Sequence, residues 1–209
     1  MQFTDRRDGG RQLAARLAAL ATEKPVVVAL PRGGVPVGAE VAAALGAPLD
    51  ILAVRKLGAP GNPELAIGAV AEDGSGVLDR RSAETLGMTR AMFEDTLQRE
   101  SRELRRRVER YRHGHAPATV RGRVVVVVDD GLATGLTVLA AIRAMRRAGA
   151  RRVVVGVPVG ARQSLEMVAE EADEVVCVSV PARLLGVGMW YRDFAPVSDE
   201  EVLALLGEG

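Results

Sequence analysis

The sequence predicts an α/β fold in which helices flank a parallel, twisted sheet. Segments with strand-like and helix-like patterns alternate along most of the 209 residues. Several strand-like segments are runs of valine without polar alternation, as in VVVVV at 124–128, which is typical of strands buried on both faces of a parallel sheet. Ligands of such sheets bind beyond the carboxyl ends of the strands. The residues that directly follow each predicted strand are therefore the ones to examine for function.

The first half of the chain predicts these elements in order: a helix over 10–22, a strand over 25–30, a helix over 37–46, a strand over 48–56, a loop over 58–63 and a hairpin over 64–79. Alanine, leucine and valine at helical spacing predict the helices, and Gly46 ends the second one. Glycine and proline dominate the loop, GAPGNP. Two strand-like runs joined by Asp73-Gly74 predict the hairpin.

The second half predicts these elements: a helix over 89–112, a strand over 122–130, a helix over 133–150, a strand over 151–160, a helix over 164–172, a strand over 173–180, an irregular tail over 184–199 and a short helix over 199–207. The charge run ESRELRRRVER (100–110) is interpreted as a solvated helix face with ion pairs between residues four apart. Glutamates interrupt its arginines, which disfavours a nucleic-acid surface.

The composition is that of an ordinary globular protein, with 48% hydrophobic and 26% charged residues. A formal net charge of +1 does not favour wholesale nucleic-acid binding. No apolar run approaches the roughly 20 residues of a membrane span, and the start, MQFTDRRDGGRQL, lacks a signal-peptide core. We therefore expect a cytoplasmic protein. The only cysteine, Cys177, is expected to be a small core residue in a strand.

Two adjacent carboxylates, Asp129 and Asp130, end the most hydrophobic run of the chain. Like charges repel there and are costly to desolvate, so a ligand that compensates the cost is expected. Gly131 and Gly135 permit a tight turn, and a helix start with free N–H groups can bind an anion. The anion site would comprise the backbone and hydroxyls of 133–137, namely Ala133, Thr134, Gly135, Leu136 and Thr137.

A ribose phosphate fits this pattern, with its phosphate on the turn and its hydroxyl groups donating to the two acids. A metal could lie between the acids and the sugar. The stretch is neither a Walker A loop nor a dinucleotide fingerprint, because the lysine of the first and the GxGxxG of the second are absent. The alternative interpretation is that the acids simply begin a loop and cap the helix.

Glycine and basic residues follow the first two predicted strands. PRGG (31–34) could turn backbone N–H groups toward an anion, with Arg32 and Gly33 at its centre, or it could be an ordinary turn. Arg55 and Lys56 end the second strand and could reach phosphate oxygens, or they could be a solvated basic pair. Lys56 is one of only two lysines in the chain.

The stretch VVVVVDDGLATGLT resembles the phosphoribosyl pyrophosphate (PRPP) motif of type I phosphoribosyltransferases. The resemblance implies that Asp129 and Asp130 hold the ribose hydroxyls and that the 133–137 turn holds the 5-phosphate. It implies a pyrophosphate loop at PRGG, with Arg55 and Lys56 on the same group. The loop 57–66 would close over the site. Asp129, Asp130 and Lys56 are expected to be catalytic, and both acids are expected to bind Mg²⁺.

The resemblance covers about residues 25–180, within a single domain expected over 1–209. An insertion is expected over about 64–113, and a variable hood or tail over 181–209. Ala133 occupies the position of the acid of 6-oxopurine members, so the motif is closer to the adenine and orotate types. In the tail MWYRDF, Trp190 or Tyr191 could stack on a base, or both could only anchor the tail. Asp193 could contact the base or a metal.

The resemblance implies a magnesium-dependent enzyme of nucleotide salvage. It would transfer the phosphoribosyl group of PRPP to a nitrogenous acceptor, with a nucleobase as the expected class. The alternative function is a PRPP-binding regulator with little or no turnover. PRPP synthesis is disfavoured, because those chains resemble a tandem of two such domains. Nucleic acid and membrane are not expected as partners, and a homodimer is plausible from the resemblance.

Overall fold

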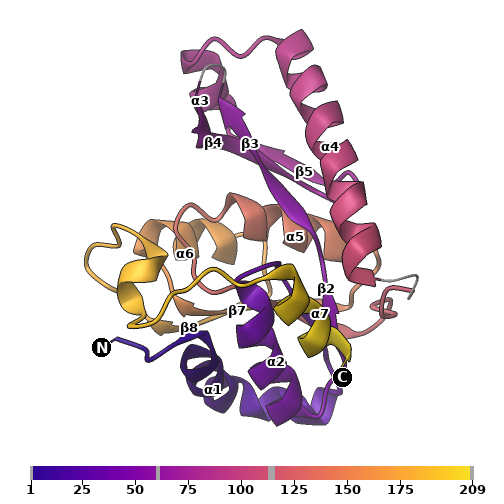
Figure 1. The fold of residues 1–209 in the computed structure, drawn as a ribbon, viewed down its shortest axis with the longest axis vertical. Helices are drawn as coiled ribbons and strands as arrows, with labels where there is room; N and C mark the ends of the chain where they lie inside the picture. Colours follow the sequence, from indigo (N-terminus) through magenta and orange to yellow (C-terminus); the bar gives the residue numbers. More distant parts are fainter. Residues whose placement is uncertain (1, 60–61, 113–115, 208–209) are drawn as a thin grey trace.

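The computed structural model describes residues 2–59, 62–112 and 116–207, and its centre is a five-stranded parallel sheet (Figure 1). The strand order is β2-β1-β6-β7-β8, and all four neighbouring pairs are parallel. The strands are β1 (Val26–Ala29), β2 (Leu49–Ile51), β6 (Val124–Val128), β7 (Arg152–Val159) and β8 (Glu174–Ser179). The predicted fold class and four of the predicted strands, all except 48–56, are confirmed.

The valines of β6 explain why this sheet forms. All five are fully buried, and they alternate between the two faces. Val125 and Val127 pack into a cluster with α5 (Leu136–Arg147). Val124, Val126 and Val128 pack into a cluster with α1 (Arg6–Leu17) and α2 (Gly34–Leu45). The sequence therefore lacks polar alternation because helices cover both faces of the strand.

Five helices flank the sheet or pack on its edge: α1 (Arg6–Leu17), α2 (Gly34–Leu45), α5 (Leu136–Arg147), α6 (Arg162–Ala169) and α7 (Asp199–Gly207). α1 begins earlier than predicted because Asp5 caps it, accepting a hydrogen bond from the Asp8 N–H. It continues as a 3₁₀ helix, η1 (Ala18–Glu23). α2 ends at Gly46, which has a φ of 58°. α5 begins at residue 136 instead of 133, because Gly135 has a φ of 80° and forms its N-cap.

The strand predicted over 48–56 is interrupted and forms two strands, because the chain leaves the main sheet after β2. The Ala53 N–H donates to the Glu72 side chain at 3.0 Å instead of continuing the ladder. Residues from Val54 onward join a separate antiparallel sheet of order β3-β4-β5. Its strands are β3 (Val54–Ala59), β4 (Asn62–Ala71) and β5 (Gly76–Leu78).

The predicted loop over 58–63 is also wrong as a whole. Its described residues extend two paired strands, with Gly58 opposite Ala66 and Ala59 opposite Asn62, across two register shifts. Glycine and proline are tolerated there because the ladder is irregular. Residues 60–61 lie outside the described residues. The predicted turn at Asp73-Gly74 is confirmed, with a φ of 81° at Gly74.

Two helices follow the second sheet. The short α3 (Arg80–Thr85) was not predicted, and α4 (Arg90–Arg112) closely matches the helix expected over 89–112. α4 runs beside β3 and β4, and its C-terminal end reaches α7 (Figure 1). The tail is largely irregular as predicted, with one 3₁₀ turn, η2 (Val187–Trp190). Within the described residues, none of the helices has the length and apolar character needed to cross a membrane.

Candidate active site

The loops after β1 and β6 meet at the carboxyl edge of the sheet, since these two strands are direct neighbours. A Cβ atom at Gly33 would lie 2.0 Å from Oδ2 of Asp130. A Cβ atom at Gly34 would lie 2.7 Å from the Val128 carbonyl oxygen and 3.0 Å from Cα of Asp129. The glycines of PRGG therefore allow this loop to lie directly against the acid pair.

The two acids are partly buried and lack full compensation for their charges. Oδ1 of Asp129 accepts a hydrogen bond from the Asp130 N–H at 2.8 Å. Burial raises the pKa of Asp129 well above its ordinary value, and the neighbouring charge of Asp130 adds to this shift. Burial also raises the pKa of Asp130, while Arg6 and Lys56 act in the opposite direction. The pair is thus suited to bind hydroxyl donors or a cation.

Arg6, at the start of α1, is a site residue that the sequence reasoning missed. Its Nε donates to Oδ2 of Asp130 at 2.9 Å, and its Nη1 donates to the Ala195 carbonyl oxygen at 2.8 Å. Its guanidinium carbon lies 3.7 Å from the centroid of the Phe194 ring. Arg6 precedes Asp130 by 124 positions, and no local pattern around DRRDGG indicates the contact.

The turn expected to bind phosphate lies beside the acids and opens onto the start of α5. The first N–H groups of this helix have no intrahelical acceptor, and Gly135 has no side chain with which to cap them. Ala133 and Thr134 are exposed. The Ala133 carbonyl accepts a hydrogen bond from Ser164 Oγ at 2.5 Å, which fixes the turn against α6. The geometry leaves an open helix N-terminus next to Asp130.

The structure brings Lys56 toward the acids but directs Arg55 elsewhere. The positive charge of Lys56 lowers the pKa of both acids. The Arg55 guanidinium instead forms ion pairs with α4, at 2.5 Å to Glu100 and 3.7 Å to Glu103. Successive side chains of a strand point to opposite faces, so the two neighbours in β3 do not share one target.

Tyr191 holds the tail against the site. The residue is 4% exposed, and its ring packs between Phe3 and Phe194, with centroid distances of 5.4 and 5.2 Å. Its hydroxyl donates to the Asp130 carbonyl oxygen at 2.5 Å. Trp190 packs, partly buried, against the same aromatic cluster. This arrangement favours the anchoring interpretation for Tyr191 that the sequence left open.

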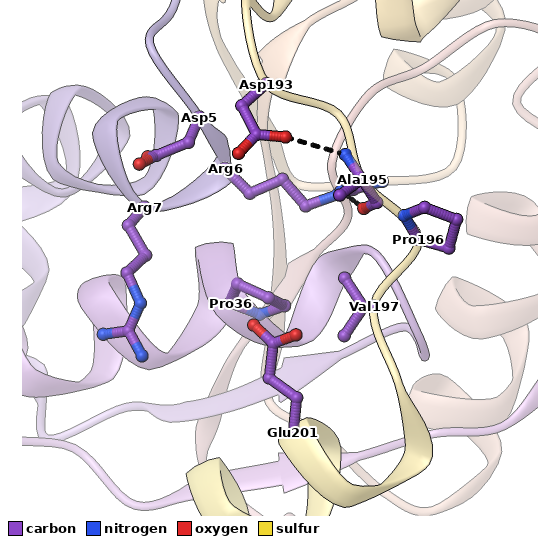
Figure 2. A pocket seen from close by; sticks show the side chains of 9 residues that line it. All are labelled: Asp5, Arg6, Arg7, Pro36, Asp193, Ala195, Pro196, Val197 and Glu201. Carbon is purple, nitrogen blue, oxygen red and sulfur yellow. Dashed lines mark hydrogen bonds between the residues drawn. The ribbon is translucent and has the colours of Figure 1, made fainter.

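A pocket of about 220 Å³ opens beside Arg6, between the start of α1, the start of α2 and the tail (Figure 2). The Arg6 guanidinium points toward the Ala195 carbonyl, and Asp193 is held above it by accepting the Ala195 N–H at 3.0 Å. Pro36 and Glu201 approach from the opposite side, and Arg7 also lines the pocket. The pocket has room for more than one or two waters, and side chains with carboxylate groups and with guanidinium groups line it.

A family model described as a phosphoribosyl transferase domain matches residues 4–191, which includes both loops, the acid pair and Tyr191. The chain belongs to the phosphoribosyltransferase family. The predicted family is thereby confirmed.

Relatives of this chain agree with it in sequence and in fold. TT1426 from Thermus thermophilus is 48% identical in sequence to this chain, and its crystal structure matches with a TM-score of 0.84. The match covers 100% of this chain and 99% of that one. The Mycobacterium tuberculosis H37Rv protein named "Putative phosphoribosyl transferase Rv0571c" is 48% identical over 204 residues, 98% of this chain. The chain spans 46% of the length of that relative.

A more distant structure, AQ2163 from Aquifex aeolicus, is 15% identical with a TM-score of 0.51, and the match covers 99% of this chain and 90% of that one. At that identity the match concerns the fold alone.

Proposed function

We propose that this phosphoribosyltransferase transfers the 5-phosphoribosyl group of PRPP to a nitrogenous acceptor, with a nucleobase as the expected class. The observation that carries the proposal is the close approach of the PRGG loop to the Asp129–Asp130 pair, which leaves no room for a Cβ atom at Gly33. A sugar held by the acids would have its 1-position facing that loop. In this proposal, the same edge of the sheet binds ribose, 5-phosphate and pyrophosphate.

The residues have separate roles in this proposal. Asp129 and Asp130 accept hydrogen bonds from the ribose hydroxyls, and the backbone of 133–137 with Thr134 and Thr137 binds the 5-phosphate. The nitrogen lone pair of the acceptor forms the new bond to C1 as the bond from C1 to the pyrophosphate oxygen breaks. Pyrophosphate departs with the bonding electrons, and the acceptor nitrogen releases its proton to water. Lys56 and the PRGG backbone stabilise the departing negative charge.

The acid pair is suited to a divalent cation, because a cation would offset the repulsion between its two partly buried carboxylates. Among the residues that the structure describes, no group of three or more histidine, cysteine, aspartate or glutamate side chains could form a closed metal cage. Mg²⁺ commonly binds through one or two carboxylates together with substrate oxygens and water. When bound here with PRPP, Mg²⁺ would neutralise charge on the pyrophosphate.

We place the acceptor next to the tail, where Asp193 and Glu201 line the pocket beside Arg6 (Figure 2). Carboxylates can accept hydrogen bonds from ring or exocyclic N–H groups of a heterocycle. Neither Trp190 nor Tyr191 lines this pocket. Trp190 retains partial exposure whereas Tyr191 is buried, so only Trp190 is a candidate to stack on an acceptor that extends beyond the pocket. Arg55 contributes indirectly, since its ion pairs position β3 and therefore Lys56.

The test is base-dependent pyrophosphate release from PRPP and Mg²⁺ with a panel of purines and pyrimidines. Release with one base would support the enzyme and identify its acceptor. The Asp129→Asn/Asp130→Asn variant should lose this release, while Gly186→Ala, whose added Cβ meets open space, should retain it. PRPP binding without release would favour the regulator instead. Neither release nor PRPP binding would contradict the proposed ligand.

A further inference from the structure

An arginine-rich pocket of about 240 Å³ lies beside the PRGG loop but is lined mainly by α4. Four arginines and one aspartate line it: Arg32, Arg106, Arg107, Arg110 and Asp199. The three arginines of α4 share one side of the helix, because position 110 is four residues after 106 and three after 107. We propose that this pocket is a second anion site that binds a phosphate group beyond the pyrophosphate position.

Arg32 connects the new site to the loop proposed for pyrophosphate. It directly precedes Gly33, which lies against the acid pair, yet the Arg32 side chain lines the arginine pocket. Its Nη1 is 3.8 Å from Oδ1 of Asp199, a loose contact, and the side chain is 47% exposed. A phosphate in the pocket would therefore be adjacent to a pyrophosphate on the PRGG backbone.

The carboxylates around the pocket already have hydrogen-bond or ion-pair partners. Asp199 accepts a hydrogen bond from the Tyr111 hydroxyl at 2.6 Å and pairs with Arg110 at 2.8 Å. Glu103 pairs with Arg106 at 3.0 Å and with Arg107 at 3.6 Å. Such exposed pairs contribute little stability, so Arg106 and Arg107 can turn from one carboxylate to a multivalent oxyanion at low cost.

Guanidinium groups suit phosphate because they donate parallel hydrogen bonds in a planar fork. Several such groups around one cavity favour an anion of more than one charge. The ligand class is accordingly a phosphate group, either the terminal group of a linked polyphosphate chain or a free phosphate next to pyrophosphate. The inference relies on the proposed function only for the pyrophosphate position on PRGG, and it requires no turnover.

The test compares calorimetric affinities for tripolyphosphate and pyrophosphate in the intact chain. The wild-type protein should bind tripolyphosphate about tenfold more tightly than pyrophosphate. Arg106→Gln/Arg107→Gln should abolish that preference while retaining PRPP-dependent pyrophosphate release. The matched control, Arg102→Gln/Arg105→Gln, removes the same charge from exposed positions of α4 that do not line the pocket, and it should retain the preference.

Inorganic phosphate titrated at saturating pyrophosphate distinguishes the two sources. If inorganic phosphate binds and Arg106→Gln/Arg107→Gln removes that binding, the ligand is a separate phosphate. If only tripolyphosphate binds, the ligand is the terminal group of a linked chain. Equal losses of the tripolyphosphate preference in both double variants would overturn the site and indicate general charge attraction. A wild-type protein that shows no preference for tripolyphosphate would also overturn it. If pyrophosphate release fails but the variant-dependent preference persists, only the proposed function is lost.

Discussion

Asp129 and Asp130 are adjacent carboxylates whose burial costs stability and whose proposed role is to bind the ligand. Each carboxylate is partly withdrawn from water, and the charge of Asp130 adds to the cost of ionising Asp129. Asp130 has compensation from Arg6 at 2.9 Å, whereas Asp129 accepts a hydrogen bond from a backbone N–H. Ionisation of Asp129 is therefore expected to destabilise the unliganded protein, and the ligand is expected to offset that cost.

Asp129→Asn should raise the free energy of unfolding by about 1 kcal/mol at neutral pH in the presence of EDTA. The folded-state pKa of Asp129 lies above its unfolded value, so wild-type stability falls as the pH rises through that interval. The gain should consequently shrink at acidic pH, where both states bind the proton. Denaturant unfolding at several pH values checks this, and lower stability of the variant at neutral pH would contradict it.

Gly33→Ala should weaken PRPP binding about tenfold or more and lower the free energy of unfolding by about 1–3 kcal/mol. The reason is steric: the φ of Gly33 is −61°, an ordinary value, but the new Cβ would meet Oδ2 of Asp130 at 2.0 Å. Gly186→Ala is the control, since its Cβ meets nothing within 4 Å. Similar effects of both substitutions would mean that the loop contact is unimportant.

The β3–β4 ribbon and α4 act as one element through Arg55. This residue was expected at pyrophosphate, but its ion pairs with Glu100 and Glu103 link β3 to α4. The sequence could not reveal the link, because the pattern after residue 48 reads as one continuous strand and nothing local marks the exit at Leu52. The exit depends on a distant side chain, Glu72, which accepts the Ala53 N–H.

Replacing both Glu100 and Glu103 with glutamine should loosen this ribbon without unfolding the main sheet. Arg55 would lose its charged partners in α4, so amide hydrogen exchange should become faster in 54–59 and 66–71 and remain unchanged in β6. Exchange followed by mass spectrometry provides the measurement. Glu109→Gln, at an exposed position of the same helix, serves as the control. Unaltered exchange in the ribbon would show that Arg55 does not secure it.

At the scale of the whole molecule, segments far apart in the sequence complete the site. The Phe3 N–H donates to the Trp190 carbonyl at 2.8 Å, and the Arg192 N–H donates back to the Phe3 carbonyl at 2.9 Å. This backbone pairing brings Arg6 and Tyr191 close to Asp130. The sequence could predict the acid motif and the strand ends, because both are local patterns. It could not predict Arg6, whose role depends on how α1 packs beneath the tail.

The two tyrosines report on this long-range packing. Burial, together with the hydrogen bond to Asp199, raises the pKa of Tyr111 to about 12, and burial raises the pKa of Tyr191 further. The phenol forms are thus favoured by the fold, so stability is lost as the pH rises from about 10 through the folded pKa values. An absorbance titration should show no tyrosinate near pH 10 in the native protein. Ionisation near pH 10, as in the denatured chain, would contradict the packing.

The central claim is that the carboxyl edge of β1 and β6 binds PRPP through the acid pair. Calorimetric titration of PRPP with Mg²⁺ into the wild-type protein and into Asp129→Asn/Asp130→Asn tests it most directly. We predict binding by the wild-type protein and an affinity at least about tenfold lower in the double variant, which should remain folded. Equal affinities, or absence of PRPP binding by the wild-type protein, would contradict the claim.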